Sequence, residues 1–197
     1  MTPIRELPSD YREARHLVLT ASGTILWLNI IAFVPMVIAF FVMAAWLVFA
    51  IRLRGAWPVE NMGGVSTWVA LIVLVVAMIP LHEGAHGLAI VWVGHKPRFG
   101  AKLSKMVVYA TTDAGLFRRN EFIVVAIAPL VVLTLLGMLL VFFVPDWGAY
   151  YISLAVILNA GSAIGDLWML AVVLRYPASA LIRDEEDGIR VFTQSTT

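Results

Sequence analysis

The sequence predicts an all-α membrane protein with four transmembrane helices and a short β-rich cytoplasmic loop between helices two and three. Hydrophobic residues make up 61% of the 197 residues and charged residues only 14%, whereas soluble domains are typically about half apolar and about a quarter charged. Four stretches reach the roughly 20 apolar residues that a helix needs to cross a bilayer. They lie at about 24–51, 65–93, 122–144 and 148–174.

These spans predict a single membrane domain over residues 1–197, with cytoplasmic tails at 1–23 and 175–197. The first apolar stretch is far longer than the core of a signal peptide and is interpreted as a retained span. It contains Pro35, which predicts a kink or a tilt.

The distribution of Lys and Arg predicts the orientation, because cytoplasmic loops carry an excess of them. With both termini cytoplasmic, 12 of the 14 Lys and Arg lie inside. The opposite orientation would reverse this ratio. The sequence therefore predicts a multi-pass protein with both termini in the cytoplasm.

The segment from His95 to Asn120 is the one sizeable loop. Residues 102–112 are rich in β-formers and are flanked by glycines, which predicts one or two short strands at the membrane surface. Residues 17–20 are a further candidate strand. The alternative is an irregular basic loop that binds anionic lipid. The acidic run 184–187 in the C-terminal tail is interpreted as a solvated stretch.

Composition also restricts the partners. The net charge is +1, and no basic stripe with interleaved aromatic residues is present, so the sequence predicts no nucleic-acid partner. The apolar spans predict that the protein lies in a lipid bilayer. The chain has no cysteine, so a transition-metal site must be built from His, Asp or Glu. No feature of the sequence predicts an oligomeric state.

The most informative motif is His82-Glu83-Gly84-Ala85-His86, near the end of the second span. Ionisable side chains are costly within a membrane and are usually functional there. His82 and His86 lie one helical turn apart, so both imidazoles can reach one metal ion. Glu83 is placed to take a proton from a water molecule that the metal activates. This spacing is the signature of zinc metallopeptidases.

A zinc site of this kind needs a third protein ligand, and Asp166 is the candidate. It is the other ionisable residue well inside a span. Counted from the outer ends of their spans, His82 and Asp166 both lie about 25–27 Å deep at 1.5 Å per residue. The two helices therefore offer ligands at one level, nearer the cytoplasmic side.

Asn159, Ser162 and Asp166 follow an i, i+3, i+7 pattern, which gives the fourth span one polar stripe. Asn159 and Ser162 are candidates for hydrogen bonds to the metal ligands or to a substrate. Ordinary interhelical hydrogen bonding is an equally good interpretation of these two residues. Pro80, just before the motif, frees the carbonyl group of Val76 and is interpreted as a kink.

Zinc held by two histidines and a carboxylate lowers the pKa of a bound water to about 7 and polarises a carbonyl group. With Glu83 as general base and then general acid, this chemistry hydrolyses a peptide bond. The pattern of His82, Glu83 and His86 in one span, with Asp166 two spans later, resembles the site-2 protease class of intramembrane zinc metalloproteases. The chain is most similar to the small zincin peptidases of bacteria and archaea.

That resemblance covers roughly residues 65–174 and implies Zn²⁺ as cofactor, His82, His86 and Asp166 as ligands, and Glu83 as the catalytic base. It further implies a membrane protein or peptide as substrate, cleaved in or next to a membrane segment, and strands in the 95–120 loop that pair with the unwound substrate. The implied location is the plasma (inner) membrane of a prokaryote. One departure is that Leu167 follows Asp166, where larger family members have glycine.

Two other hypotheses account for the same residues. A metal-binding transport or sensor protein would use the histidines and Asp166 as a passage or sensing site, although the four spans show no inverted repeat. A purely structural helix bundle would use them as a hydrogen-bonded polar cluster and would bind no stoichiometric metal.

Overall fold

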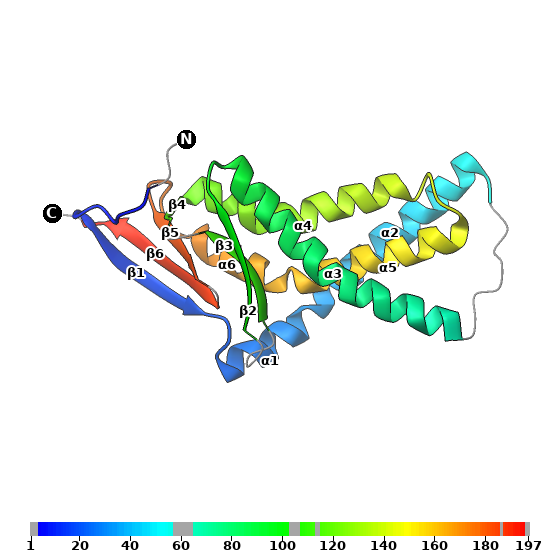
Figure 1. Ribbon diagram of the computed structural model, residues 1–197, viewed down its shortest axis with the longest axis horizontal. Helices are drawn as coiled ribbons and strands as arrows, with labels where there is room; N and C mark the ends of the chain where they lie inside the picture. Colours follow the sequence, from blue (N-terminus) through cyan, green and yellow to red (C-terminus); the bar gives the residue numbers. More distant parts are fainter. Residues whose placement is uncertain (1–3, 57–64, 103–106, 113–114, 186, 196–197) are drawn as a thin grey trace. The chain divides into compact units, whose positions relative to one another are not determined.

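The computed structural model describes residues 4–56, 65–102, 107–112, 115–185 and 187–195. Figure 1 shows the elements in these ranges. The helices are α1 (Ser22–Ile31), α2 (Phe33–Arg54), α3 (Val65–Trp92), α4 (Arg119–Leu140), α5 (Asp146–Ser162) and α6 (Ile164–Val173). The strands are β1 (Tyr11–Val18), β2 (Pro97–Lys102), β3 (Val107–Thr112), β4 (Phe117–Arg118), β5 (Leu181–Glu185) and β6 (Gly188–Gln194).

The prediction of an all-α, four-span fold is wrong, because the chain combines its helices with two antiparallel sheets. Three helical stretches are long and apolar enough to cross a membrane, namely Gly23–Arg54, Val65–Trp92 and Arg119–Leu140. The first stretch covers α1 and α2 together, and the other two are α3 and α4. The fourth predicted span is instead two helices, α5 and α6, separated by a break at Ala163. Three strands of the larger sheet, β1, β5 and β6, lie in the predicted tails, outside the apolar stretches, and the sheet was therefore missed. The candidate strand at 17–20 overlaps only the last two residues of β1.

The described chain forms two compact units. Unit 1 contains residues 1–28, 83–128 and 165–197, and unit 2 contains residues 29–82 and 129–164. Each unit has a hydrophobic core of its own. The prediction of one membrane domain over the whole length stays a prediction.

Unit 1 is built on a four-stranded antiparallel sheet with the order β1-β6-β5-β4. The strand near the N-terminus pairs along its length with the last strand of the chain, from Tyr11 opposite Gln194 to Val18 opposite Gly188. A side chain at Gly188 would collide with the carbonyl oxygen of Leu17, so glycine is required for this close approach. The acidic run that was predicted to be solvated lies instead at the end of β5 and before β6.

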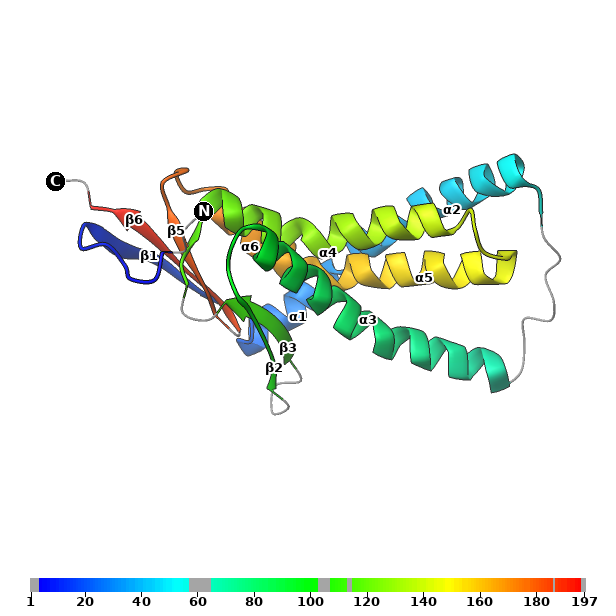
Figure 2. The same cartoon turned by 45° about the horizontal axis from the view of Figure 1, so that its top comes forward.

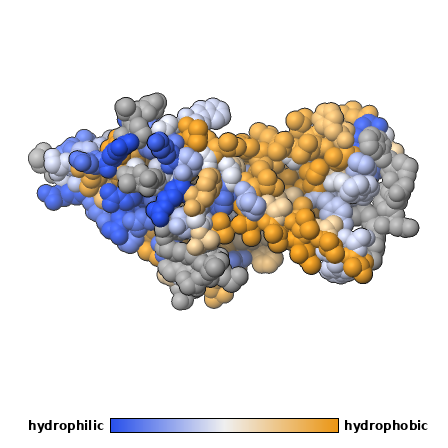
Figure 3. All heavy atoms as spheres, viewed as in Figure 1, coloured by the Kyte–Doolittle hydropathy of each residue, from blue (hydrophilic) through white to orange (hydrophobic). Residues whose placement is uncertain are grey.

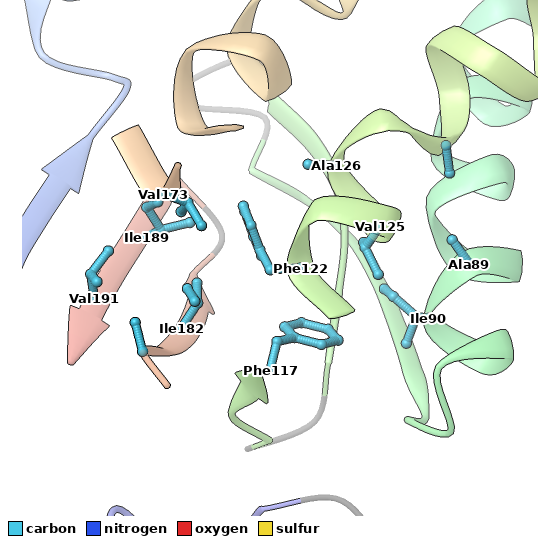
Figure 4. Packing of buried hydrophobic residues seen from close by; sticks show 12 residues of the cluster. Ala89, Ile90, Phe117, Phe122, Val125, Ala126, Val173, Ile182, Ile189 and Val191 are labelled. Atoms are coloured by element: carbon cyan, nitrogen blue, oxygen red, sulfur yellow. The ribbon is translucent and has the colours of Figure 1, made fainter. Parts of the chain in front are cut away.

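The sheet packs against the ends of three helices through one apolar core (Figure 4). Ile182, Ile189 and Val191 come from the sheet, and Phe117 and Phe122 fill the centre. Further members from the helices are Ala89 and Ile90 of α3, Val125 and Ala126 of α4, and Val173 of α6. This core fixes the helix segments that carry Glu83, His86 and Asp166.

The loop after α3 forms a second, two-stranded sheet in which β2 pairs with β3 from Pro97 opposite Thr112 to Lys102 opposite Val107. The predicted strands in this loop are therefore present, although positions 103–106 lie outside the described residues. The hairpin meets the larger sheet at β5, where the Thr111 hydroxyl donates a hydrogen bond of 3.2 Å to the carbonyl oxygen of Asp184.

Unit 2 consists of helices packed around a core of small and branched apolar side chains. Met43 and Leu47 of α2 meet Val141 beyond α4 and Val156 of α5 in this core. At the ends of α2 and α5, Arg54 and Asp146 form an ion pair of 2.6 Å. The side chains of Arg54 and Asp146 are only 10% and 5% exposed, so this ion pair joins the two helices in a nearly buried position.

Large apolar side chains are exposed along all the long helices, including Phe41 of α2, Ile72 of α3 and Leu135 of α4. On the face drawn in Figure 3, apolar side chains gather over the helices and hydrophilic ones over the four-stranded sheet. Exposure of this extent is expected where a protein is surrounded by lipid rather than water. With three helices long enough to span a bilayer, these surfaces indicate a membrane protein.

Candidate metal site

Helix α3 carries the motif in its C-terminal half, with both histidines buried. His82 and His86 expose only 8% and 7% of their surfaces, and the Glu83 between them is partly buried. A side chain at Gly87 would collide with the ring of Phe99, so this glycine allows β2 to pack against α3 beside His86. Buried imidazoles need hydrogen-bond partners, and each finds a different one.

The Nδ1 atom of His86 lies 2.9 Å from the backbone carbonyl oxygen of Val125 in α4. A carbonyl oxygen can only accept, so Nδ1 carries the proton. This carbonyl is open to a side chain because α4 contains Pro129, four residues later, which has no N–H to donate to it. The proline thus leaves an acceptor that fixes the tautomer of His86 and keeps its Nε2 lone pair accessible.

The Nδ1 atom of His82 lies 3.0 Å from Oδ1 of Asn159 in α5. The amide nitrogen of Asn159 donates a hydrogen bond of 3.0 Å to the carbonyl oxygen of Pro129. Because that carbonyl accepts only, the amide must present its oxygen to His82, and Nδ1 of His82 must be the donor. Both imidazoles are therefore held as Nδ1–H tautomers with Nε2 available to a metal.

Asp166 lies in the first turn of α6 and is 9% exposed. One of its carboxylate oxygens lies 3.4 Å from Nε2 of His86. His82, His86 and Asp166 each offer a ligand atom, and these atoms all lie within 4.8 Å of one another. The structure thus brings together the three residues that the sequence predicts as metal ligands.

The donor set fits zinc. Two imidazole nitrogens and a carboxylate oxygen are usual ligands of catalytic Zn²⁺, which leaves a fourth position open. Ligand atoms about 2.1 Å from a tetrahedral zinc ion are about 3.4 Å apart, and the observed separation between His86 and Asp166 equals this value. The other two separations are at most 4.8 Å.

Of the two polar residues predicted beside the ligands, the structure places only Asn159 against a histidine. Asn159 is fully buried between His82 and Pro129. The Ser162 side chain is exposed, and its hydroxyl donates to the carbonyl oxygen of Leu158, four residues earlier in the same helix. A role of Ser162 at the site stays a prediction.

Sequence analysis missed two residues that bear on the site. Pro129 helps to position both imidazoles, because its missing N–H leaves the Val125 carbonyl open to His86 and its own carbonyl binds Asn159. The feature of the sequence that could have identified it is a proline in the middle of an apolar span. Asp184, in the partly buried strand β5, lies close enough to interact electrostatically with His86, Asp166 and Glu83. Burial raises the pKa of Asp184 from 3.8 to about 7. The signal for its strand was Asp187-Gly188, a dipeptide typical of hairpin turns.

These observations define a membrane protein with a buried cluster of two histidines and an aspartate that can hold a metal ion. A family model described as "putative zincin peptidase" matches residues 75–181, which is more than half of the chain, and the chain belongs to this family. The family implies a metallopeptidase that uses zinc. No curated protein and no solved structure matches the chain.

Proposed function

We propose that the protein is an intramembrane zinc endopeptidase, similar to the site-2 protease class, that hydrolyses a peptide bond in or next to a membrane segment of a protein substrate. The single observation that carries the proposal is the convergence of His82, His86 and Asp166, with both histidines held in the tautomer that a metal requires. Membership of the zincin peptidase family supports the same activity.

In this proposal, zinc bound by the three side chains supplies an acidified water molecule and a Lewis acid for the carbonyl group of the substrate. Glu83 takes the proton of the attacking water and delivers it to the leaving amine. Asn159 and the Val125 carbonyl group keep the two imidazoles oriented throughout. The apolar surroundings strengthen each of these electrostatic interactions.

The β2–β3 hairpin is the proposed platform for the substrate. Within the described residues, β2 pairs only with β3, so the other edge of β2 is open to a further strand. Phe99 of β2 lies against Gly87, the residue after His86. A substrate segment unwound onto this edge would run past the metal site.

The proposed location is the plasma membrane of a prokaryote, crossed several times, with both termini cytoplasmic. The excess of Lys and Arg in the tails and in the loop after α3 supports this orientation. The metal site would then lie toward the cytoplasmic side, within reach of water.

Glu83→Gln tests the proposed reaction. The variant should keep one zinc per chain and lose cleavage of a reconstituted membrane peptide by at least about a hundredfold, since general acid–base catalysis contributes about 10²–10⁴-fold. His82→Ala and Asp166→Ala should both lose the metal, measured by elemental analysis of detergent-purified protein. Undiminished cleavage by Glu83→Gln would exclude Glu83 as the base. Altered metal uptake with no peptide product in any variant would favour transport or sensing instead.

A further inference from the structure

Unit 2 contains an apolar cavity of about 230 Å³ between α3, α4 and α5. Ala77 and Met78 of α3, Leu133 of α4, and Ala155 and Val156 of α5 are among the residues that line it. Tyr151 is the one lining residue with a polar side-chain atom. A cavity with so few polar partners is unfavourable for ordered water and suits an apolar ligand.

The cavity lies one helical turn from the hydrogen-bonded chain that holds His82. On α3, Met78 precedes His82 by four residues, and on α5, Ala155 precedes Asn159 by four. On α4, Leu133 follows Pro129 by four. Each of the three walls is therefore displaced along its helix by about 6 Å, the rise of four residues. The cavity borders the support of a proposed metal ligand on three helices at once.

The three helices that line the cavity separate toward the beginning of α3. Figures 1 and 2 both show α3 diverging from α4 and α5 toward its beginning at Val65, within the part of α3 that belongs to unit 2. The opposite face of α3 at this level is exposed, with Val73 at 60% and Val76 at 61%. Apart from Tyr151, the walls between these helices present apolar side chains to a group held in the cavity.

We propose that this cavity is a side-chain subsite that takes one large apolar side chain of the substrate's membrane segment, next to the bond that is cleaved. This inference rests on the proposed function. An engineered apolar cavity of about 150 Å³ holds benzene, so the larger volume here accommodates a phenyl ring or a branched aliphatic side chain. A lipid acyl chain is much larger than the cavity, whereas a single apolar side chain matches its volume.

The first experiment measures side-chain preference. The probe is a Leu-rich model transmembrane peptide in phosphatidylcholine vesicles, whose cleavage site is mapped by mass spectrometry and whose flanking residues are replaced singly by Ala. One flanking position should show a ten- to hundredfold fall in kcat/KM on Leu→Ala. Ala155→Phe, which fills the cavity, should reduce this discrimination to less than threefold and leave the zinc content unchanged. Val76→Phe, on the exposed face of α3, should behave as the parent.

Discrimination that survives in Ala155→Phe would overturn the subsite, and so would an equal loss in Val76→Phe. The second experiment does not depend on hydrolysis. Because the chain has no cysteine, Ala77→Cys and Val76→Cys each introduce a single thiol, and both are made in the inactive Glu83→Gln background. A model peptide whose one cysteine is activated as a 2-thiopyridyl disulfide should exchange with the thiol of Ala77→Cys, with release of thiopyridone, at least tenfold faster than with that of Val76→Cys.

Equal rates of disulfide formation, or selective labelling of Ala77→Cys by a reactive acyl chain that the peptide does not displace, would contradict the subsite and favour a bound lipid. Selective linkage without any cleavage by the parent protein would remove the proposed function and leave the binding site. Cleavage without selective linkage and without side-chain preference would remove the binding site and leave the proposed function. The two failures are therefore distinguishable.

Discussion

Two histidine clusters, one within helix α3 and one just beyond its end, each place a buried imidazole beside a carboxylate, and they differ in what they can do. Beyond the end of α3 at Trp92, Nε2 of His95 lies 3.5 Å from a carboxylate oxygen of Glu121, much as Nε2 of His86 lies 3.4 Å from Asp166. Both histidines are buried, at 5% and 7% exposure. Burial beside a carboxylate therefore does not distinguish a metal ligand from a structural histidine.

The difference lies in the remaining partners. Glu121 already accepts two hydrogen bonds from Arg118, at 2.7 and 2.8 Å, so its charge is balanced without a metal. Nδ1 of His95 has no hydrogen-bond partner among the described residues, and the ring packs on Phe117 at 4.6 Å between centroids. The His95 cluster joins the end of α3 to the start of α4. At the other cluster, each Nδ1 is anchored and a second imidazole faces the same point.

The largest expected effect is a loss of zinc affinity on substitution of His86 but not of His95. His86→Ala removes a predicted ligand and should lower zinc affinity by more than about a hundredfold, which exceeds the effect usual for residues that only support a ligand. His95→Gln keeps a donor toward Glu121 and should retain one zinc per chain, with a loss of about 1 kcal/mol in the free energy of unfolding.

Zinc content and denaturant titration of the two purified variants measure both effects. If His95→Gln lost its zinc while remaining folded, the distinction drawn between the clusters would be wrong. If His86→Ala kept a full equivalent of zinc, the ion would lie elsewhere in the chain.

An intermediate effect is expected for the anchors of the imidazoles. Asn159→Leu removes the acceptor of the His82 Nδ1–H and should weaken zinc binding by about 10–100-fold. Ser162→Ala, three residues further along α5, is the matched control, because its hydroxyl bonds only to the Leu158 carbonyl among the contacts described. Competition with a chelator of known affinity measures both. Equal effects of the two substitutions would indicate a general loss of helix packing rather than loss of an anchor.

The parts of the fold and of the metal site that could be predicted are those that depend on residues close together in the sequence. The motif on α3 and the depth of Asp166 were readable because helical spacing and span length are regular, and these residues do come together. The Pro129 carbonyl was not readable, because its bond to Asn159 joins residues 30 apart on different helices. The larger sheet was missed because β1 pairs with β6, and these two strands lie near opposite ends of the chain.

The smallest effect concerns Asp184, which no motif identified. Its pKa is raised by burial from 3.8 to about 7, so the folded chain binds this proton more tightly than the unfolded chain does. The stability that results is complete below about pH 4 and is lost as pH rises toward 7. Asp184→Asn cannot ionise, so in zinc-free protein the fall in unfolding free energy between pH 4 and 7, at most about 1.4 kcal/mol per pH unit, should become shallower.

The adjacent Glu185→Gln is the control for this change, because its carboxylate pairs with Arg190 at 2.6 Å and with His16 at 3.3 Å on the surface of the sheet. It should leave the slope between pH 4 and 7 nearly unchanged. Denaturant titrations in detergent at several pH values measure both slopes. A slope in Asp184→Asn as steep as that of the parent would show that Asp184 ionises freely and is not enclosed with His86 and Asp166. A shallower slope only in Asp184→Asn would place a third acidic group, besides Glu83 and Asp166, beside the metal cluster and make the terminal sheet part of the site.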